Sequence, residues 1–150
     1  MPINAIVIRT SWLYSEYGNN FVKTMLRLGR ERDELKVVSD QMGSPTYATD
    51  LADVILEIIK HKKFRYLGQT MQIYHYSSEE EISWYEFAKE IFKIAKIDCK
   101  VNPINTEQFP TLAKRPRNTY LYSSKVTKAY SIKGLFWKSS LNRCLIQIID

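Results

Sequence analysis

The chain has 150 residues, 45% of them hydrophobic and 25% charged, and its formal net charge is +6. This composition suits one globular unit and excludes a disordered or fibrous protein. No apolar run approaches the length of about 18 residues that a membrane span needs. The positive balance favours anionic partners, from nucleic acid to phosphorylated small molecules, without choosing among them.

The first half of the chain predicts five elements, in the order strand, helix, strand, helix, strand. Strands are indicated by short apolar or alternating runs, and helices by apolar residues that recur on one face. The five elements lie at residues 5–8, 21–32, 35–38, 51–59 and 71–76. Thr49 or Asp50 is expected to cap the second helix. This order favours an α/β layer arrangement.

The second half predicts one strong helix and several weaker elements. Ser83 and Glu86 form an S-x-x-E capping box at the start of the strong helix,. A stretch that contains prolines predicts at most a short helix near Glu107. The strong helix, the stretch with prolines and two further helices lie at about residues 84–96, 102–118, 123–130 and 140–149.

Neither cysteines nor histidines form a recognisable metal pattern. Cys99 and Cys144 lie far apart, so we expect two free thiols in a reducing compartment, the cytoplasm. His61 and His75 lack patterned Cys or Glu partners, so no metal site is predicted. The opening residues MPINAIVIRT lack the basic and long apolar regions of a secretory signal.

Tyr85 and Lys89 are spaced as Y-x-x-x-K, the proton-donating signature of short-chain dehydrogenases/reductases. One helical turn apart, a lysine can lower the pKa of a tyrosine. That chemistry also needs a glycine-rich phosphate loop between a strand and a helix. The five glycines do not cluster as G-x-G-x-x-G,. We therefore interpret Tyr85 as an ordinary helix residue and predict no catalytic residue in this chain.

Four segments occur in a family's order and cover nearly the whole chain. They are IVIRTSWLYSEYGNNFVKTML, DQMGSPTYATDLAD, ISWYEFAKEIF and AKRPRNTYLYSSKV. Together they resemble the dTDP-4-dehydrorhamnose reductases, which are extended short-chain dehydrogenases/reductases. The resemblance implies that residue 1 corresponds to a point well inside the family's chain. The family's glycine-rich loop, most of its parallel sheet and its own Tyr-x-x-x-Lys precede that point.

The resemblance implies an α/β fold, made of the remnant of a Rossmann-type parallel sheet and a small mixed α/β substrate-binding domain. Residues 1–70 would be the last strands and helices of the nucleotide-binding domain, and residues 71–150 the substrate-binding domain. Two positions depart from the family's pattern. Tyr122 stands where the family usually has Asp or Asn, and Thr49 stands where some members have a metal-bridging glutamate.

The resemblance also implies which residues bind ligands. Trp12 matches an active-site tryptophan that would form a flat wall for the sugar. Amide groups at a helix start suit a pyrophosphate, and arginine can contact a phosphate through two hydrogen bonds. The expected substrate-binding residues are Trp12, Asn19, Gln41, Thr46, Arg115 and Asn118. Thr10 and Ser11 would lie at the edge where the cofactor binds.

The whole enzyme is thereby expected to reduce the C4 ketone of dTDP-4-dehydro-L-rhamnose with NADPH or NADH. This chain alone is expected to be inactive, with a nucleotide-sugar as its partner and neither nucleic acid nor membrane. An exposed sheet edge makes a homodimer possible. Two alternatives stay open: a non-catalytic partner protein of the same family, and a basic nucleic-acid module. The second rests on basic and aromatic residues such as KKFRYLG at residues 62–68, without a recognised motif,.

Overall fold

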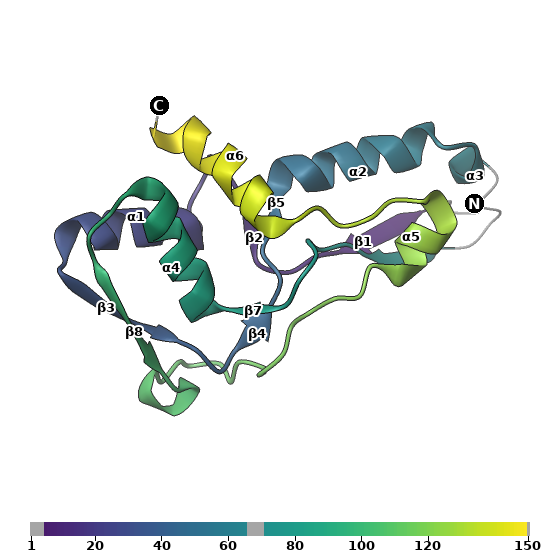
Figure 1. Ribbon diagram of the computed structural model, residues 1–150. Coiled ribbons are helices and arrows are strands. Elements are labelled where there is room, and N and C mark those ends of the chain that lie inside the picture. The colour runs from purple at the N-terminus through teal and green to yellow at the C-terminus, as the bar shows by residue number, and fades with distance from the viewer. Residues whose placement is uncertain (1–4, 66–70, 150) are drawn as a thin grey trace.

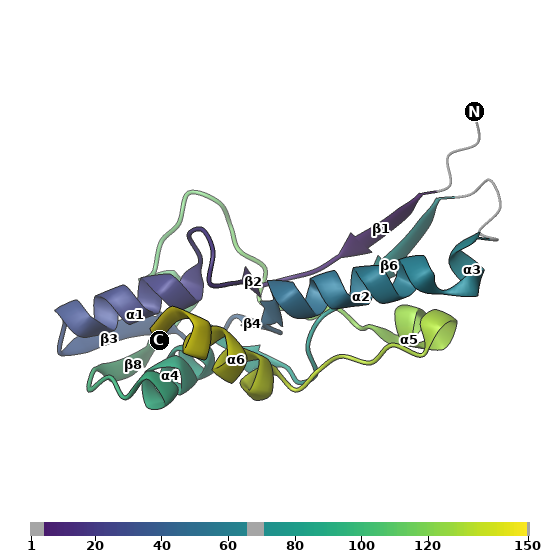
Figure 2. The ribbon, with the colours of Figure 1, turned by 90° about the horizontal axis from the view of Figure 1, so that it is seen from above.

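Two lobes meet at a set of short strands in the computed structural model, which describes residues 5–65 and 71–149 (Figures 1 and 2). One lobe contains β1 (Ile6–Arg9), α2 (Ala48–Lys60), α3 (Lys62–Arg65), β6 (Gln72–His75) and α5 (Ser124–Tyr130). The other contains α1 (Phe21–Glu31), β3 (Glu34–Val38), α4 (Trp84–Ala95), β8 (Lys100–Ile104), the 3-10 helix Thr106–Gln108 and α6 (Trp137–Ile149). Between them lie β2 (Leu13–Tyr14), β4 (Met42–Gly43), β5 (Thr46–Tyr47) and β7 (Ile82–Ser83).

Parallel strand pairs dominate both lobes. β1 pairs in parallel with β6, and β3 pairs in parallel with β8. At the junction β2 pairs in parallel with β5, while β4 and β7 are antiparallel. The predicted α/β class is confirmed. The strand predicted at residues 35–38 is β3, which pairs with β8 and not with β1. Its buried Leu35 and Val37 pack in the cluster formed with α1 and α4.

Each lobe has its own hydrophobic cluster. In the larger one, Phe87 and Ile91 on α4 are fully buried against α1 and α6. In the smaller one, Val54 and Ile58 on α2 pack with Tyr74 of β6 and with α5. Burial of each large apolar side chain stabilises the fold by roughly 1.5–3 kcal/mol. The helical periodicity of these residues is what directs one face of each helix into a cluster.

The predicted domain boundary at residue 70 stays a prediction. The pairs β1–β6 and β3–β8 each join a strand before that residue to a strand after it. The larger cluster likewise contains residues from Tyr14 to Leu145. Residues 66–68 of the KKFRYLG stretch lie outside the described residues.

The structure corrects three local predictions. The cap of α2 is Tyr47 instead of Thr49 or Asp50, and Asp50 lies within the first turn with its carboxylate directed at α6. β8 was not predicted because Pro103 suggested a loop. A proline lacks the N–H for a ladder hydrogen bond, which an edge strand tolerates. α6 begins at Trp137, three residues before the predicted start.

Other local features agree with the sequence. Ser83 and Glu86 form the predicted capping box of α4, and Asn20 caps α1 by accepting a hydrogen bond from the Lys23 amide. Cys99 and Cys144 are free thiols, and both are buried. Among the described residues, no helix combines the length and the apolar character needed to cross a membrane.

Candidate functional site

Trp12 lies in the turn between β1 and β2, at the junction of the two lobes. Its ring stacks on Trp84, with 3.5 Å between the centroids and 12° between the planes. Trp84 is the first residue of α4, so the Ser83–Glu86 capping box fixes the start of the helix that carries the Trp84 ring. Trp12 has a backbone φ of 47°, in the left-handed region that a bulky residue rarely adopts,. Strain of this kind is common at functional sites.

The edge of the Trp12 indole lies directly over Gly43 of β4. A Cβ atom at Gly43 would stand 2.5 Å from Cε2 of Trp12 and 2.6 Å from Oγ1 of Thr119. Only glycine therefore permits this approach. Thr119 is held there because its N–H and its hydroxyl both donate to the Met42 carbonyl, at 2.9 and 3.1 Å. We call Trp12, Gly43, Thr46, Trp84 and Thr119 the tryptophan site.

Hydroxyl groups lie within the tryptophan site and beside it. The Thr46 N–H donates to the Trp12 carbonyl at 3.2 Å, and the Ser11 hydroxyl donates to the Ser44 carbonyl at 3.4 Å. Within residues 5–65 and 71–149, the Oγ1 atoms of Thr10 and Thr46 are buried and have no hydrogen-bond partner. A buried hydroxyl without a partner is unusual, and a bound ligand is one way to satisfy it.

Asn118 and Gln41 lie on the segments that flank the tryptophan site. Asn118 forms a bridge with Met42, and its amide donates to the Glu81 carboxylate. Gln41 donates from Nε2 to the Thr106 hydroxyl at 3.2 Å. The same hydroxyl donates to Asp40, and this hydrogen bond lowers the pKa of the Asp40 carboxyl below its usual value.

Among the described residues, no hydrogen bond or ion pair joins Arg115 or Asn19 to the tryptophan site. Arg115 belongs to the exposed segment 111–118, which also carries Lys114 and Arg117. None of these three cations takes part in an ion pair found among the described residues. Asn19 is exposed next to the cap of α1. Both predicted ligand contacts therefore stay predictions.

Tyr85 and Lys89 lie on the outer part of α4. The Lys89 ammonium stands 5.3 Å from the centroid of the Tyr85 ring. Tyr85 is half-buried and packs against the larger hydrophobic cluster. This is the placement of a core-flanking tyrosine, and the prediction that the pair transfers no proton stays a prediction.

Sequence reasoning missed three contributors to the tryptophan site. Trp84, Gly43 and Thr119 were not among the expected ligand-binding residues. The Trp12–Trp84 stack joins residues 72 positions apart, so no local spacing indicates it. The adjacency of Thr119 to Asn118 was the one available signal. In the described part of the chain, no group of three or more His, Cys, Asp or Glu residues is placed to hold a metal.

The chain is similar in sequence and in structure to proteins of one known family. The family described as the RmlD substrate binding domain matches residues 2–149. The dTDP-4-dehydrorhamnose reductase of Aggregatibacter actinomycetemcomitans is 45% identical over 145 residues, which cover 91% of this chain and 48% of that protein. A crystal structure of the Clostridium acetobutylicum dTDP-4-dehydrorhamnose reductase superimposes with a TM-score of 0.84 at 40% identity, covering 97% of this chain and 49% of that one.

A second solved structure is that of dTDP-4-dehydrorhamnose reductase from Bacillus anthracis in complex with NADP. It is 40% identical, has a TM-score of 0.83, and matches 95% of this chain and 48% of its own. This chain thus spans about half the length of the relatives it matches. Because the family match covers nearly the whole sequence, this chain belongs to the RmlD substrate binding domain family.

Proposed function

We propose that this chain is the substrate-binding part of a dTDP-4-dehydrorhamnose reductase. The complete activity would reduce the C4 ketone of dTDP-4-dehydro-L-rhamnose to the alcohol of dTDP-L-rhamnose. NADPH or NADH would supply the hydride. The chain on its own is expected to bind nucleotide-sugar and not to reduce it, because it contains neither a glycine-rich phosphate loop nor the family's catalytic tyrosine and lysine.

The observation that carries the proposal is the tryptophan site. A stacked pair of half-buried indoles lies against a glycine that admits close approach and beside buried hydroxyls that have no partner among the described residues, so flat apolar and polar groups meet here. A sugar ring presents the same combination, with C–H faces and hydroxyl edges. Trp12 would pack against the sugar, and Thr46 would offer its hydroxyl to a polar group of the ligand.

The phosphates would be bound at the flanking segments. Arg115 and Asn118 belong to one segment and Gln41 to another, and both segments meet at Met42. A guanidinium that takes part in no described ion pair can contact a phosphate through two N–H groups,. Asn19, beside the start of α1, would contribute an amide.

The cofactor edge is assigned to Thr10 and Ser11, which follow β1 at its carboxyl end. Ligands of parallel α/β sheets bind at this end of the strands. Thr10 fits such a role because its buried Oγ1 has no hydrogen-bond partner among the described residues. Both hydroxyls would orient the cofactor and would take no part in proton transfer.

The direct test is a calorimetric titration of the chain with dTDP, with dTMP as the comparison ligand that lacks the second phosphate. Binding of dTDP at roughly millimolar concentration or below, with weaker binding of dTMP, is expected. A Trp12→Ala variant should lose most of the heat. Absence of dTDP binding at millimolar concentration would contradict the proposal.

Two features of the expected setting accompany the proposal. We expect a cytoplasmic location, which the free, buried thiols Cys99 and Cys144 support because secreted proteins tend to form disulfides,. The exposed sheet edge also makes a homodimer possible. Light scattering after size exclusion tests it, and a monomer at all concentrations would contradict it.

A further inference from the structure

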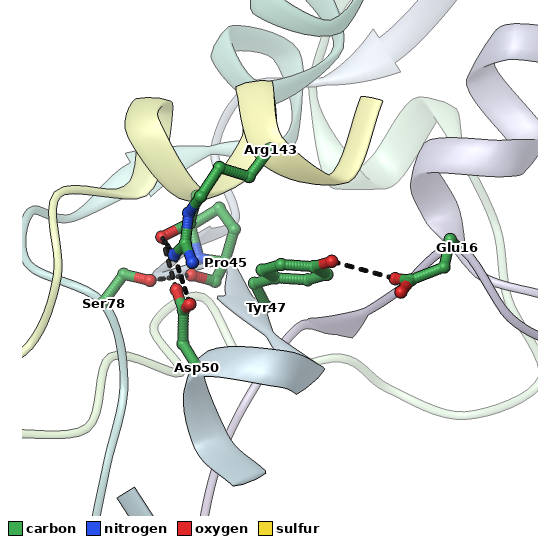
Figure 3. A network of polar contacts seen from close by, with 7 residues as sticks. Glu16, Pro45, Tyr47, Asp50, Ser78 and Arg143 are labelled. Carbon is green, nitrogen blue, oxygen red and sulfur yellow. Dashed lines mark hydrogen bonds and ion pairs between the residues drawn. The ribbon is translucent and has the colours of Figure 1, made fainter. Parts of the chain in front are cut away.

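Arg143 on α6 reaches a buried carboxylate at the start of α2 (Figure 3). The Asp50 side chain is 2% exposed. It accepts hydrogen bonds from the Arg143 guanidinium and from the Ser140 hydroxyl. A buried carboxylate persists in a fold only where it is paired and hydrogen-bonded. These contacts therefore join α6 to α2, although Asp50 and Arg143 are 93 positions apart in the chain.

The same guanidinium lies over the ring of Tyr47, 5.6 Å from its centroid. Tyr47 is held from its other side as well. Its hydroxyl donates to the Glu16 carboxylate at 3.1 Å (Figure 3). Its ring stacks on Tyr14 with 5.6 Å between centroids. Tyr47 belongs to β5, which pairs with β2. β5 is thus packed between α6 and β2.

β5 in turn determines where Trp12 lies. The Thr46 N–H of β5 donates to the Trp12 carbonyl at 3.2 Å. A residue in the left-handed region keeps that conformation only when its surroundings impose it, and the φ of Trp12 is 47°. A displacement of β5 would release the Trp12 backbone and change the 3.5 Å stacking on Trp84.

We propose that Arg143 and Asp50 are positioning residues for Trp12. Their ion pair holds β5 between α6 and β2, and β5 holds the Trp12 indole in the stack that forms the tryptophan site. The inference rests on the proposed function where ligand affinity is concerned. The geometry of the two indoles, however, is measurable without any ligand.

The test compares four variants of the full chain by circular dichroism, by thermal unfolding and by calorimetric titration with dTDP. Two stacked indoles couple their strong ultraviolet transitions into a pair of bands of opposite sign, and Trp84→Phe identifies that signal by abolishing it. Arg143→Gln removes the ion pair and leaves Asp50 charged. The double variant Asp50→Asn/Arg143→Gln removes both charges. Lys138→Gln is the matched control, because Lys138 is an α6 cation paired with Glu90 on α4.

In Arg143→Gln we expect a diminished indole signal and dTDP binding weaker by roughly tenfold. The double variant should regain thermal stability, since no unpaired charge stays buried, while its indole signal and affinity remain low. Lys138→Gln should match the unaltered chain in its indole signal and in its affinity for dTDP.

Recovery of the indole signal together with stability in the double variant would overturn the proposal, because the pair would then serve stability alone. An unfolded double variant would overturn it for the same reason. If Arg143→Gln does not fold, the double variant decides the question. If the unaltered chain binds no dTDP, the proposed function fails, and the indole signal still tests the positioning role.

Discussion

Substitution of Gly43 by alanine tests whether the tryptophan site depends on close approach. The added Cβ would lie 2.5 Å from Cε2 of Trp12 and 2.6 Å from Oγ1 of Thr119. Two hydrogen bonds hold Thr119 on the Met42 carbonyl, so its side chain cannot turn away without losing the one that the hydroxyl donates. The indole is therefore expected to move, and this movement would change its stacking on Trp84.

The expected cost has two parts. Overpacking of a filled position costs about 1–3 kcal/mol. Disruption of an aromatic pair costs about 0.5–1.5 kcal/mol more. A loss of about 1.5–4.5 kcal/mol in the free energy of unfolding follows if both apply. For a chain of this size, 1 kcal/mol shifts the midpoint of thermal unfolding by about 2–4 °C, so the shift should be readily measurable.

Urea unfolding and the circular dichroism of the stacked indoles provide the assay. Gly18→Ala is the matched control: its Cβ would meet nothing within 4 Å, but its φ is +64°. Gly18→Ala should lower the free energy of unfolding by about 1–2 kcal/mol, because alanine is strained at this backbone conformation, and it should leave the indole signal intact. A Gly43→Ala chain with unchanged stability and an unchanged indole signal would refute the close-approach argument.

Three further predictions concern a cap, a buried tyrosine and a phosphate contact. Ser83→Ala should destabilise the chain by about 1 kcal/mol in urea unfolding through loss of the α4 cap, whereas the exposed Ser139→Ala should have almost no effect,. Burial raises the pKa of Tyr76 from 10 to about 12. The unfolded chain loses the Tyr76 proton at a lower pH than the folded chain does. The protonated Tyr76 therefore contributes its full stability below about pH 10, and this contribution is lost as the pH rises towards 12,. In Tyr76→Phe the decline of the unfolding free energy over this range should be flatter. Arg115→Ala should weaken dTDP binding in calorimetry by roughly tenfold, and an equal loss in Arg27→Ala, which breaks only a surface ion pair, would contradict a specific contact.

The helices with clear local signals were predictable from the sequence. The Ser83–Glu86 box and the Asn20 cap each involve residues three positions apart, so they act wherever the chain is placed. The apolar period of α4 likewise indicated its buried face. β8 was missed because its partner β3 lies more than 60 residues earlier, and only that pairing makes a proline-containing segment a strand.

The sequence alone determined the fold class, the principal helices and the family resemblance, because these depend on short-range periodicity and on short sequence motifs. The tertiary structure alone decided that Trp12 stacks on Trp84, that Gly43 lies beneath the indole and that Arg143 pairs with Asp50. Each of these contacts joins segments that are distant in the chain. These contacts form only when the two packed lobes bring their loops together, and local sequence patterns do not predict that geometry.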